Sequence, residues 1–246
     1  MKSGPGTLYG VGVGPGDPEL ITLKAVRVLK TARVVCFFRK RGSKGHALTI
    51  ARPFLPVSAI EIPFEYPVTT EVRFTDDDYV RPISEFYAVA ANSIAHYLGE
   101  GQDVALLCEG DPFFYGSFLH MYERLRGHFP SVVIPGVTGM SGCWTSAGAP
   151  ITLGDDVLTV LPGTLAADDL TAKLRSTDAA AIMKVGCNLP KIREALRLSG
   201  RLEEAIYVER GTMEGERVVP LWQVEALAAP YFSIVLVPGC RGRRIL

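Results

Sequence analysis

The stretch from Leu8 to Leu20 constrains the fold of this chain more than any other part of the sequence. It reads Leu-Tyr-Gly-Val-Gly-Val-Gly-Pro-Gly-Asp-Pro-Glu-Leu, an apolar run that passes through alternating glycines into a polar helix start. Glycine allows tight turns, while Asp17 and Pro18 suit the first positions of a helix. A strand, a glycine turn and a helix in this order predict an α/β fold. Backbone N–H groups then line the carboxyl edge of a sheet, where ligands usually bind.

The same stretch does not fit the dinucleotide-binding pattern G-x-G-x-x-G. In each of its three registers the place of the last glycine is taken by another residue, namely Pro15, Asp17 or Glu19. Pro15 also lacks an N–H group and has a fixed φ, so the turn is stiff and one donor short for a phosphate. We therefore expect a shaped, largely neutral ligand, and a nicotinamide-dependent oxidoreductase is disfavoured. The alternative is a tight turn that binds no ligand.

The overall composition excludes several classes of protein. The 246 residues are 48% hydrophobic and 21% charged, which is ordinary for a globular chain of one large or two small domains. The formal net charge is zero, so no global field attracts nucleic acid or an anionic membrane. No apolar run approaches the length of a membrane span, and the first residues lack the apolar core of a signal peptide. We expect a cytoplasmic protein.

The cysteines, histidines and clustered carboxylates do not indicate a metal site. The five cysteines lie far apart without a C-x-x-C motif, and the four histidines show no metal-type spacing. We expect free thiols in a reducing compartment and no bound metal. Asp76, Asp77 and Asp78 are adjacent, but this pattern is more typical of a solvated helix start than of a metal site.

A second strand and turn repeat the chemistry of the first. The apolar run at 104–108 predicts a buried strand, and Glu-Gly-Asp-Pro-Phe-Phe-Tyr-Gly-Ser follows it at 109–117. Turns after parallel strands open onto the same edge of a sheet, so we expect this turn beside the first one. A further strand at 131–135 leads into a helix of small residues that opens with Gly-Val-Thr-Gly at 136–139. Small side chains let a ligand approach closely, although packing between helices favours the same composition.

The rest of the chain completes an α/β pattern. The basic run Arg39 to Lys44 follows a predicted strand at 32–38, and it lies at the ligand edge unless it is only a solvated charge run. The alternation of strands and helices predicts two α/β domains, residues 1–135 with a mostly parallel sheet and residues 136–246 with a mixed sheet. Further strands are expected at 59–63, 157–161, 179–185, 204–209 and 232–237, and further helices at 20–29, 80–98, 167–174 and 189–198, with a loop over 64–79.

Together, three ordered motifs resemble those of the tetrapyrrole (corrin/porphyrin) C-methyltransferases. They are G-V-G-P-G-D-P-E-L-I-T at 12–22, G-D-P-F-F-Y-G at 110–116 and I-P-G-V-T at 134–138. The resemblance implies methyl transfer from S-adenosylmethionine to a tetrapyrrole ring. It is strongest to the members that methylate precorrin-2 at C20 to give precorrin-3A in cobalamin biosynthesis. Supporting stretches lie at 66–71, 140–144, 155–164, 182–186 and 207–213.

The family resemblance implies two α/β domains with the donor between them, a homodimer, and no metal, nucleic acid or membrane partner. The Met183 assignment below could shift to Val185. The residues that the resemblance assigns to the donor are Pro15, Glu109, Gly110, Asp111, Phe114, Thr138, Gly139, Met183 and Gly211. The cations that could meet the carboxylates of the substrate are Arg39, Lys40, Arg41, Lys44, Lys184 and Arg210.

Two positions depart from the family pattern and leave the proton acceptor open. Phe38 stands where relatives carry an acidic residue after the second strand, and Glu109 stands where many have glycine. Glu109 could accept the proton that the methylated ring carbon loses, or it could be a structural carboxylate. Tyr115 could orient the substrate or pack in the core.

Two other functions remain, a C20-methyltransferase for the cobalt-loaded ring of the anaerobic route and a non-catalytic sensor of tetrapyrroles or adenosyl ligands.

Overall fold

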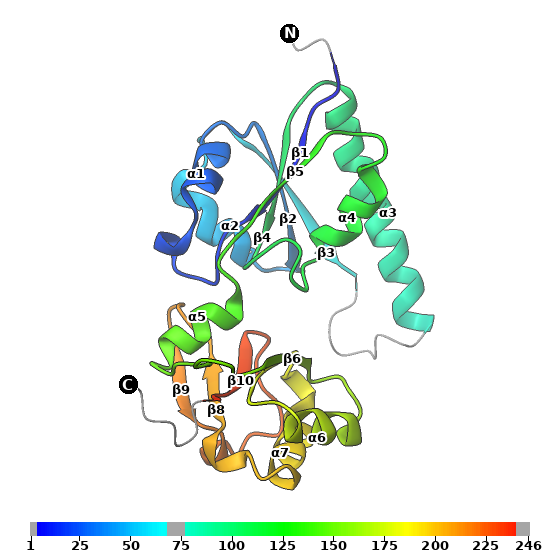
Figure 1. The fold of residues 1–246 in the computed structure, drawn as a ribbon. Helices are drawn as coiled ribbons and strands as arrows, with labels where there is room; N and C mark the ends of the chain where they lie inside the picture. The colour runs from blue at the N-terminus through cyan, green and yellow to red at the C-terminus, as the bar shows by residue number, and fades with distance from the viewer. Residues whose placement is uncertain (1–3, 68–76, 240–246) are drawn as a thin grey trace. The chain divides into compact units, whose positions relative to one another are not determined.

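The protein divides into two compact units, residues 1–139 and 140–246, and each is built on a five-stranded sheet (Figure 1). The computed structural model describes residues 4–67 and 77–239, and the following account is of those residues. The division falls after Gly139, whereas the sequence placed a boundary after residue 135. The difference arises because the segment after the fifth strand packs against glycines of the first unit.

The sheet of the first unit is entirely parallel, with the strand order β3-β2-β4-β1-β5. All five strands therefore end at one carboxyl edge, and the turns that follow them meet there. The strands are β1 (Leu8–Gly12), β2 (Val34–Lys40), β3 (Ile60–Tyr66), β4 (Val104–Cys108) and β5 (Ser131–Ile134), and the helices are α1 (Leu23–Leu29), α2 (His46–Ala51), α3 (Asp77–Gly99) and α4 (Phe118–Leu125).

Helices cover both faces of this sheet. In β2, Val34 and Cys36 face the core shared with α3 and α4, while Val35 and Phe37 face the core shared with α1 and α2. Figure 1 shows the two helix pairs on opposite sides of the strands. A strand buried on both faces needs apolar residues at successive positions, which explains why β2 and β4 read as continuous apolar runs.

Several predicted boundaries in the first unit were wrong. Asp17 caps only a single 3-10 turn, by accepting the Glu19 N–H at 2.8 Å, and α1 begins later with Thr22 as its N-cap. The strand β2 continues through Lys40, so the basic run begins inside the sheet. Helix α2 was not anticipated, β3 runs on to residue 66, and α3 begins three residues before the predicted position 80. Of the predicted loop at 64–79, residues 68–76 lie outside the described part of the chain, as does Asp76.

The sheet of the second unit is mixed, with the order β6-β7-β10-β8-β9. Strand β6 is parallel to β7, β10 is antiparallel to both β7 and β8, and β9 is antiparallel to β8. Consequently β6, β7 and β8 all end at one edge. The elements are β6 (Leu158–Pro162), β7 (Ala179–Met183), β8 (Ile206–Glu209), β9 (Arg217–Pro220), β10 (Ser233–Val237), α5 (Gly139–Ser146), α6 (Ala167–Arg175) and α7 (Leu189–Leu198). Strand β9 was not predicted.

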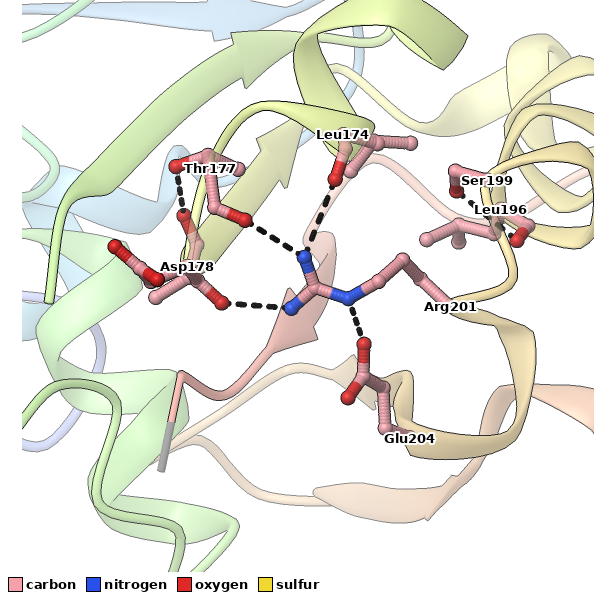
Figure 2. A network of polar contacts seen from close by, with 8 residues as sticks. Leu174, Thr177, Asp178, Leu196, Ser199, Arg201 and Glu204 are labelled. Carbon is pink, nitrogen blue, oxygen red and sulfur yellow. Dashed lines mark hydrogen bonds and ion pairs between the residues drawn. The ribbon is translucent and has the colours of Figure 1, made fainter. Parts of the chain in front are cut away.

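A buried arginine ties the helical side of the second unit together (Figure 2). Arg201 is only 6% exposed, and its guanidinium donates to the carbonyl oxygens of Leu174, Thr177 and Asp178 at 3.2, 2.8 and 2.7 Å. Its Nε pairs with the Glu204 carboxylate. The buried charge is thus compensated, and the end of α6 is fixed to the segment that precedes β8.

None of the helices in the described segments is both long and apolar enough to span a bilayer.

Candidate functional site

Three glycine turns of the first unit meet at the carboxyl edge of its sheet. The Gly110 N–H donates to the Gly14 carbonyl oxygen at 2.8 Å, and the reverse bond is 3.4 Å long. A Cβ atom built on Gly136 would lie 2.1 Å from the Gly110 oxygen, and one built on Gly12 would lie 2.6 Å from the Gly136 nitrogen. The turns after β1, β4 and β5 are therefore in direct backbone contact, which only glycine allows.

The donor residues that the sequence assigned to the first unit lie around this glycine junction. A Cβ on Gly110 would lie 3.4 Å from the Gly139 nitrogen and 3.7 Å from the Thr138 Cα, so these segments are adjacent. Gly139 itself has open space where its side chain would be. Pro15 is buried directly after Gly14. The structure thus brings together Pro15, Glu109, Gly110, Asp111, Phe114, Thr138 and Gly139.

The carboxylate of Asp111 joins two of the turns. Its Oδ1 accepts the Phe113 N–H at 2.9 Å, and its Oδ2 accepts the Gly136 N–H at 3.1 Å. Both oxygens are therefore engaged by backbone groups. Asp111 was expected to contact the donor, and in this geometry its carboxylate fixes the backbone of the two turns.

Glu109 connects the turn after β4 to helix α2. Its Oε1 accepts the Ala47 N–H at 3.1 Å. Desolvation raises the pKa of this carboxyl, and hydrogen bonds from backbone N–H groups and the nearby His46 oppose the shift. The residue is nevertheless exposed to solvent, which limits this rise in pKa. A raised pKa suits a proton acceptor, while the bond to Ala47 suits a structural role.

Residues with left-handed backbone geometry gather after strand ends. The non-glycine residues with positive φ in the described segments are Tyr115 (56°), Lys184 (55°), Arg210 (50°) and Thr212 (66°). They follow β4, β7 and β8, and the first three are candidate site residues. Such a conformation costs on the order of 1–3 kcal/mol and persists where the surroundings impose it, often at functional sites. Nothing in the local sequence predicts it, because these residue types rarely adopt it.

The candidates of the second unit lie along the edge where β6, β7 and β8 end. Met183 is the last residue of β7, and its carbonyl oxygen accepts the Gly163 N–H at 2.6 Å. Of the two alternatives, Val185 is 1% exposed in the core with α7, whereas Met183 is partly exposed. Gly211 lies against α5, where a Cβ would come within 2.7 Å of the Cys143 sulfur.

The basic residues divide into separate groups. Arg39 donates through Nε and Nη2 to Glu65 at 3.1 and 2.8 Å. With Lys44 it lines a pocket of about 530 Å³ beside β2, β3 and α2, and Arg52 pairs with Glu61 there. Lys40 and Arg41 are exposed and do not line this pocket, and Lys184 and Arg210 belong to the second unit.

A cluster of hydroxyl groups beside the second glycine turn was missed from the sequence. The Tyr66 hydroxyl lies 2.6 Å from the Ser117 hydroxyl, which also accepts from Tyr87 at 3.1 Å. Phe38 stacks on Tyr66 with ring centroids 5.6 Å apart. The position of Ser117 directly after the turn was the available signal, but its partners come from β3 and α3 and could not be read locally.

The thiols and acidic groups offer no evident metal centre. Among residues 4–67 and 77–239, no three side chains of His, Cys, Asp or Glu come together to hold a metal ion. Burial raises the pKa values of Cys36 and Cys108, and raises that of Cys143 to about 12. These three thiols are therefore protonated at neutral pH, while Cys187 is exposed. Cys240 lies outside the described residues.

Parallel strands that end in packed glycine turns, together with a second mixed α/β unit, define a two-unit α/β ligand-binding protein. The chain belongs to the family of Tetrapyrrole (Corrin/Porphyrin) Methylases, whose family model matches residues 7–239. This finding confirms both the fold class and the family that the sequence motifs indicated.

Individual relatives agree with this assignment. The chain is 52% identical over 240 residues to a precorrin-2 C(20)-methyltransferase from a Sinorhizobium species, covering 98% of each chain. It is 27% identical over 240 residues to a cobalt-precorrin-2 C(20)-methyltransferase of Salmonella typhimurium, covering 94% of this chain and 96% of the other. The X-ray structure of a cobalt precorrin-4 methyltransferase shares the fold, with a TM-score of 0.71 at 20% identity over 94% of both chains.

Proposed function

We propose that this protein transfers the methyl group of S-adenosylmethionine to C20 of precorrin-2, giving precorrin-3A. The observation that carries the proposal is the 52% identity, over nearly the full length of both chains, to a precorrin-2 C(20)-methyltransferase. Two relatives named for the cobalt-loaded ring are only 27% and 31% identical to this chain, which favours the metal-free substrate. The resemblance further implies a cytoplasmic homodimer, which we include in the proposal.

The donor supplies a methyl group bound to a positively charged sulfur. Transfer of this group to carbon depends on alignment and exclusion of water more than on a protein nucleophile. The glycine junction suits that task because its backbone is packed without side chains and leaves open space at Gly139. We assign the donor to this junction through Pro15, Gly110, Phe114, Thr138 and Gly139, and to Met183 and Gly211 of the second unit, with Asp111 fixing the turns.

Glu109 is our candidate for the group that takes the proton released at C20. It follows β4 directly, borders Gly110, and has a raised pKa. The variant Glu109→Gln keeps an oxygen to accept the Ala47 N–H but cannot take a proton. We expect its kcat to fall by about 100-fold or more, with the donor Kd unchanged. An unchanged kcat would assign Glu109 to structure alone.

The carboxylates of the substrate call for cations at the rim of the site. Arg39 and Lys44 share one pocket, and Arg39 is oriented by Glu65, which suits the two to a substrate carboxylate. We include Lys40, Arg41, Lys184 and Arg210 as further carboxylate partners. Tyr115 is 50% exposed and held in a left-handed conformation, and we assign it to orienting the ring.

The deciding experiment is incubation of the purified protein with precorrin-2 and methyl-labelled S-adenosylmethionine. Mass spectrometry should show the gain of one methyl group, and NMR should place the label at C20. A parallel reaction with cobalt-precorrin-2 separates the two substrates, and faster turnover there would move the protein to the anaerobic route. Donor binding without turnover on either ring would indicate a sensor. A label on another carbon would refute the C20 assignment.

A further inference from the structure

The connection between β8 and β9 is the most strained segment among the described residues. It contains two of their four left-handed non-glycine residues, Arg210 and Thr212. Threonine is β-branched, and a positive φ is a genuine outlier for such a residue. A connection between antiparallel strands does not require this geometry, because hairpins usually turn on glycine or asparagine. The strain therefore calls for a specific restraint and for a reason to keep it.

Two side chains supply the restraint on Thr212. Its N–H donates to Glu216 Oε2 at 2.6 Å and to the Ser146 hydroxyl oxygen at 3.1 Å. The Ser146 hydroxyl donates to the same Glu216 oxygen at 2.6 Å. A carboxylate that accepts from both groups makes charge-assisted bonds, which are stronger than neutral ones. The cluster of Glu216, Ser146 and the Thr212 N–H is called the Glu216 clamp; each of its three groups is hydrogen-bonded to the other two.

The clamp fastens the strained turn to helix α5. Ser146 is the last residue of α5, and Cys143 lies on the same face of the helix, three residues earlier. The sulfur of Cys143 accepts a hydrogen bond from the Gly211 N–H. A side chain on Gly211 would collide with that sulfur at 2.7 Å. Two successive residues of the turn, Gly211 and Thr212, are thus held on one helix.

We infer that Glu216, together with Ser146, is a positioning residue for the methyl donor. By holding Thr212 in its left-handed conformation, it places Gly211 against α5, the helix that begins at Gly139. This inference rests on the proposed function, which assigns Gly211 and Gly139 to the donor. Glu216 itself is exposed and belongs to no apolar cluster, so its loss should change the turn and leave the core of the unit intact.

The test is a double-mutant cycle on donor affinity, read by calorimetry with S-adenosylmethionine. Glu216→Ala removes the acceptor of both bonds, and we expect donor Kd to rise about tenfold with little change in Tm. Glu216→Gln is the matched control. Both bonds end on one oxygen, Oε2, so an amide oxygen can replace it, and we expect Kd to stay within about threefold of wild type.

The second variant of the cycle, Thr212→Gly, removes the backbone strain at this position. Glycine adopts a positive φ without help, so Thr212→Gly should keep donor affinity and raise Tm slightly. In that background Glu216→Ala should no longer weaken binding. An equal loss of affinity in both backgrounds, or no loss in either, would overturn the inference. Failure of the wild-type protein to bind the donor at all would instead overturn the proposed function, and the inference with it.

Discussion

The glycine junction makes Gly136→Ala the most informative single substitution in the first unit. The added methyl carbon would lie 2.1 Å from the Gly110 carbonyl oxygen and 3.0 Å from two backbone atoms of Gly12. Ordinary van der Waals contact begins near 3.4 Å. Because the obstructing atoms are backbone and not the end of a flexible side chain, the methyl group can fit only if the three turns move apart by about 1 Å.

This displacement sets the size of the expected losses in stability and in reaction rate. Overpacking costs about 1–3 kcal/mol, and a clash with two backbone segments belongs at the upper end. A loss of about 3 kcal/mol lowers Tm by roughly 6–12 °C in a chain of this size. A misplacement of about 1 Å at a site that depends on alignment can lower the rate about 100-fold. We therefore expect Gly136→Ala to lose both stability and methyl transfer.

Thermal unfolding, donor calorimetry and the methyl-transfer reaction are measured on Gly136→Ala and on two matched control variants. Gly127→Ala adds a methyl group where nothing lies within 4 Å, away from the junction, and should behave as wild type. Gly139→Ala also meets no protein atom, but in space assigned to the donor, so it should weaken donor binding without lowering Tm. A Gly136→Ala protein with wild-type Tm and donor affinity would refute the packing of the junction.

Three further outcomes follow from individual contacts. Arg201→Met should destabilise the second unit by about 3–5 kcal/mol in denaturant titrations, because three carbonyl oxygens and the partly buried Glu204 carboxylate lose their partner; a change below about 1 kcal/mol would contradict this. Asp111→Ala should weaken donor binding more than Asp111→Asn, whose single amide oxygen can still accept one of the two backbone N–H groups. A wild-type donor affinity of Asp111→Ala in calorimetry would remove Asp111 from the site. For Glu109, the fold favours the protonated carboxyl, so that contribution to stability is complete below the ordinary glutamate pKa and is lost as pH rises through the raised pKa. The Tm of wild type should therefore fall relative to that of Glu109→Gln as the pH rises above the ordinary glutamate pKa, and parallel curves would contradict the shift.

The sequence by itself determined the class of fold and the family. The strand at 104–108 was predicted with its observed bounds, because a strand buried on both faces needs an unbroken apolar run. The glycine turns were visible for a similar reason. A tight turn restricts residue type locally, so Gly12, Gly110 and Gly136 stand out in any reading of the chain.

Only the tertiary structure decided which groups those local features bring together. Strand β2 runs on to Lys40 because β3 supplies pairing partners up to Tyr66, which no pattern within β2 reveals. Asp111 was found from its motif, but its engagement by Gly136 depends on a residue 25 positions away. The Glu216 clamp is more remote still, since Ser146 and Glu216 are separated by 70 positions. Apolar periodicity and turn chemistry act over a few neighbouring residues, whereas the partner of a carboxylate depends on how distant segments pack.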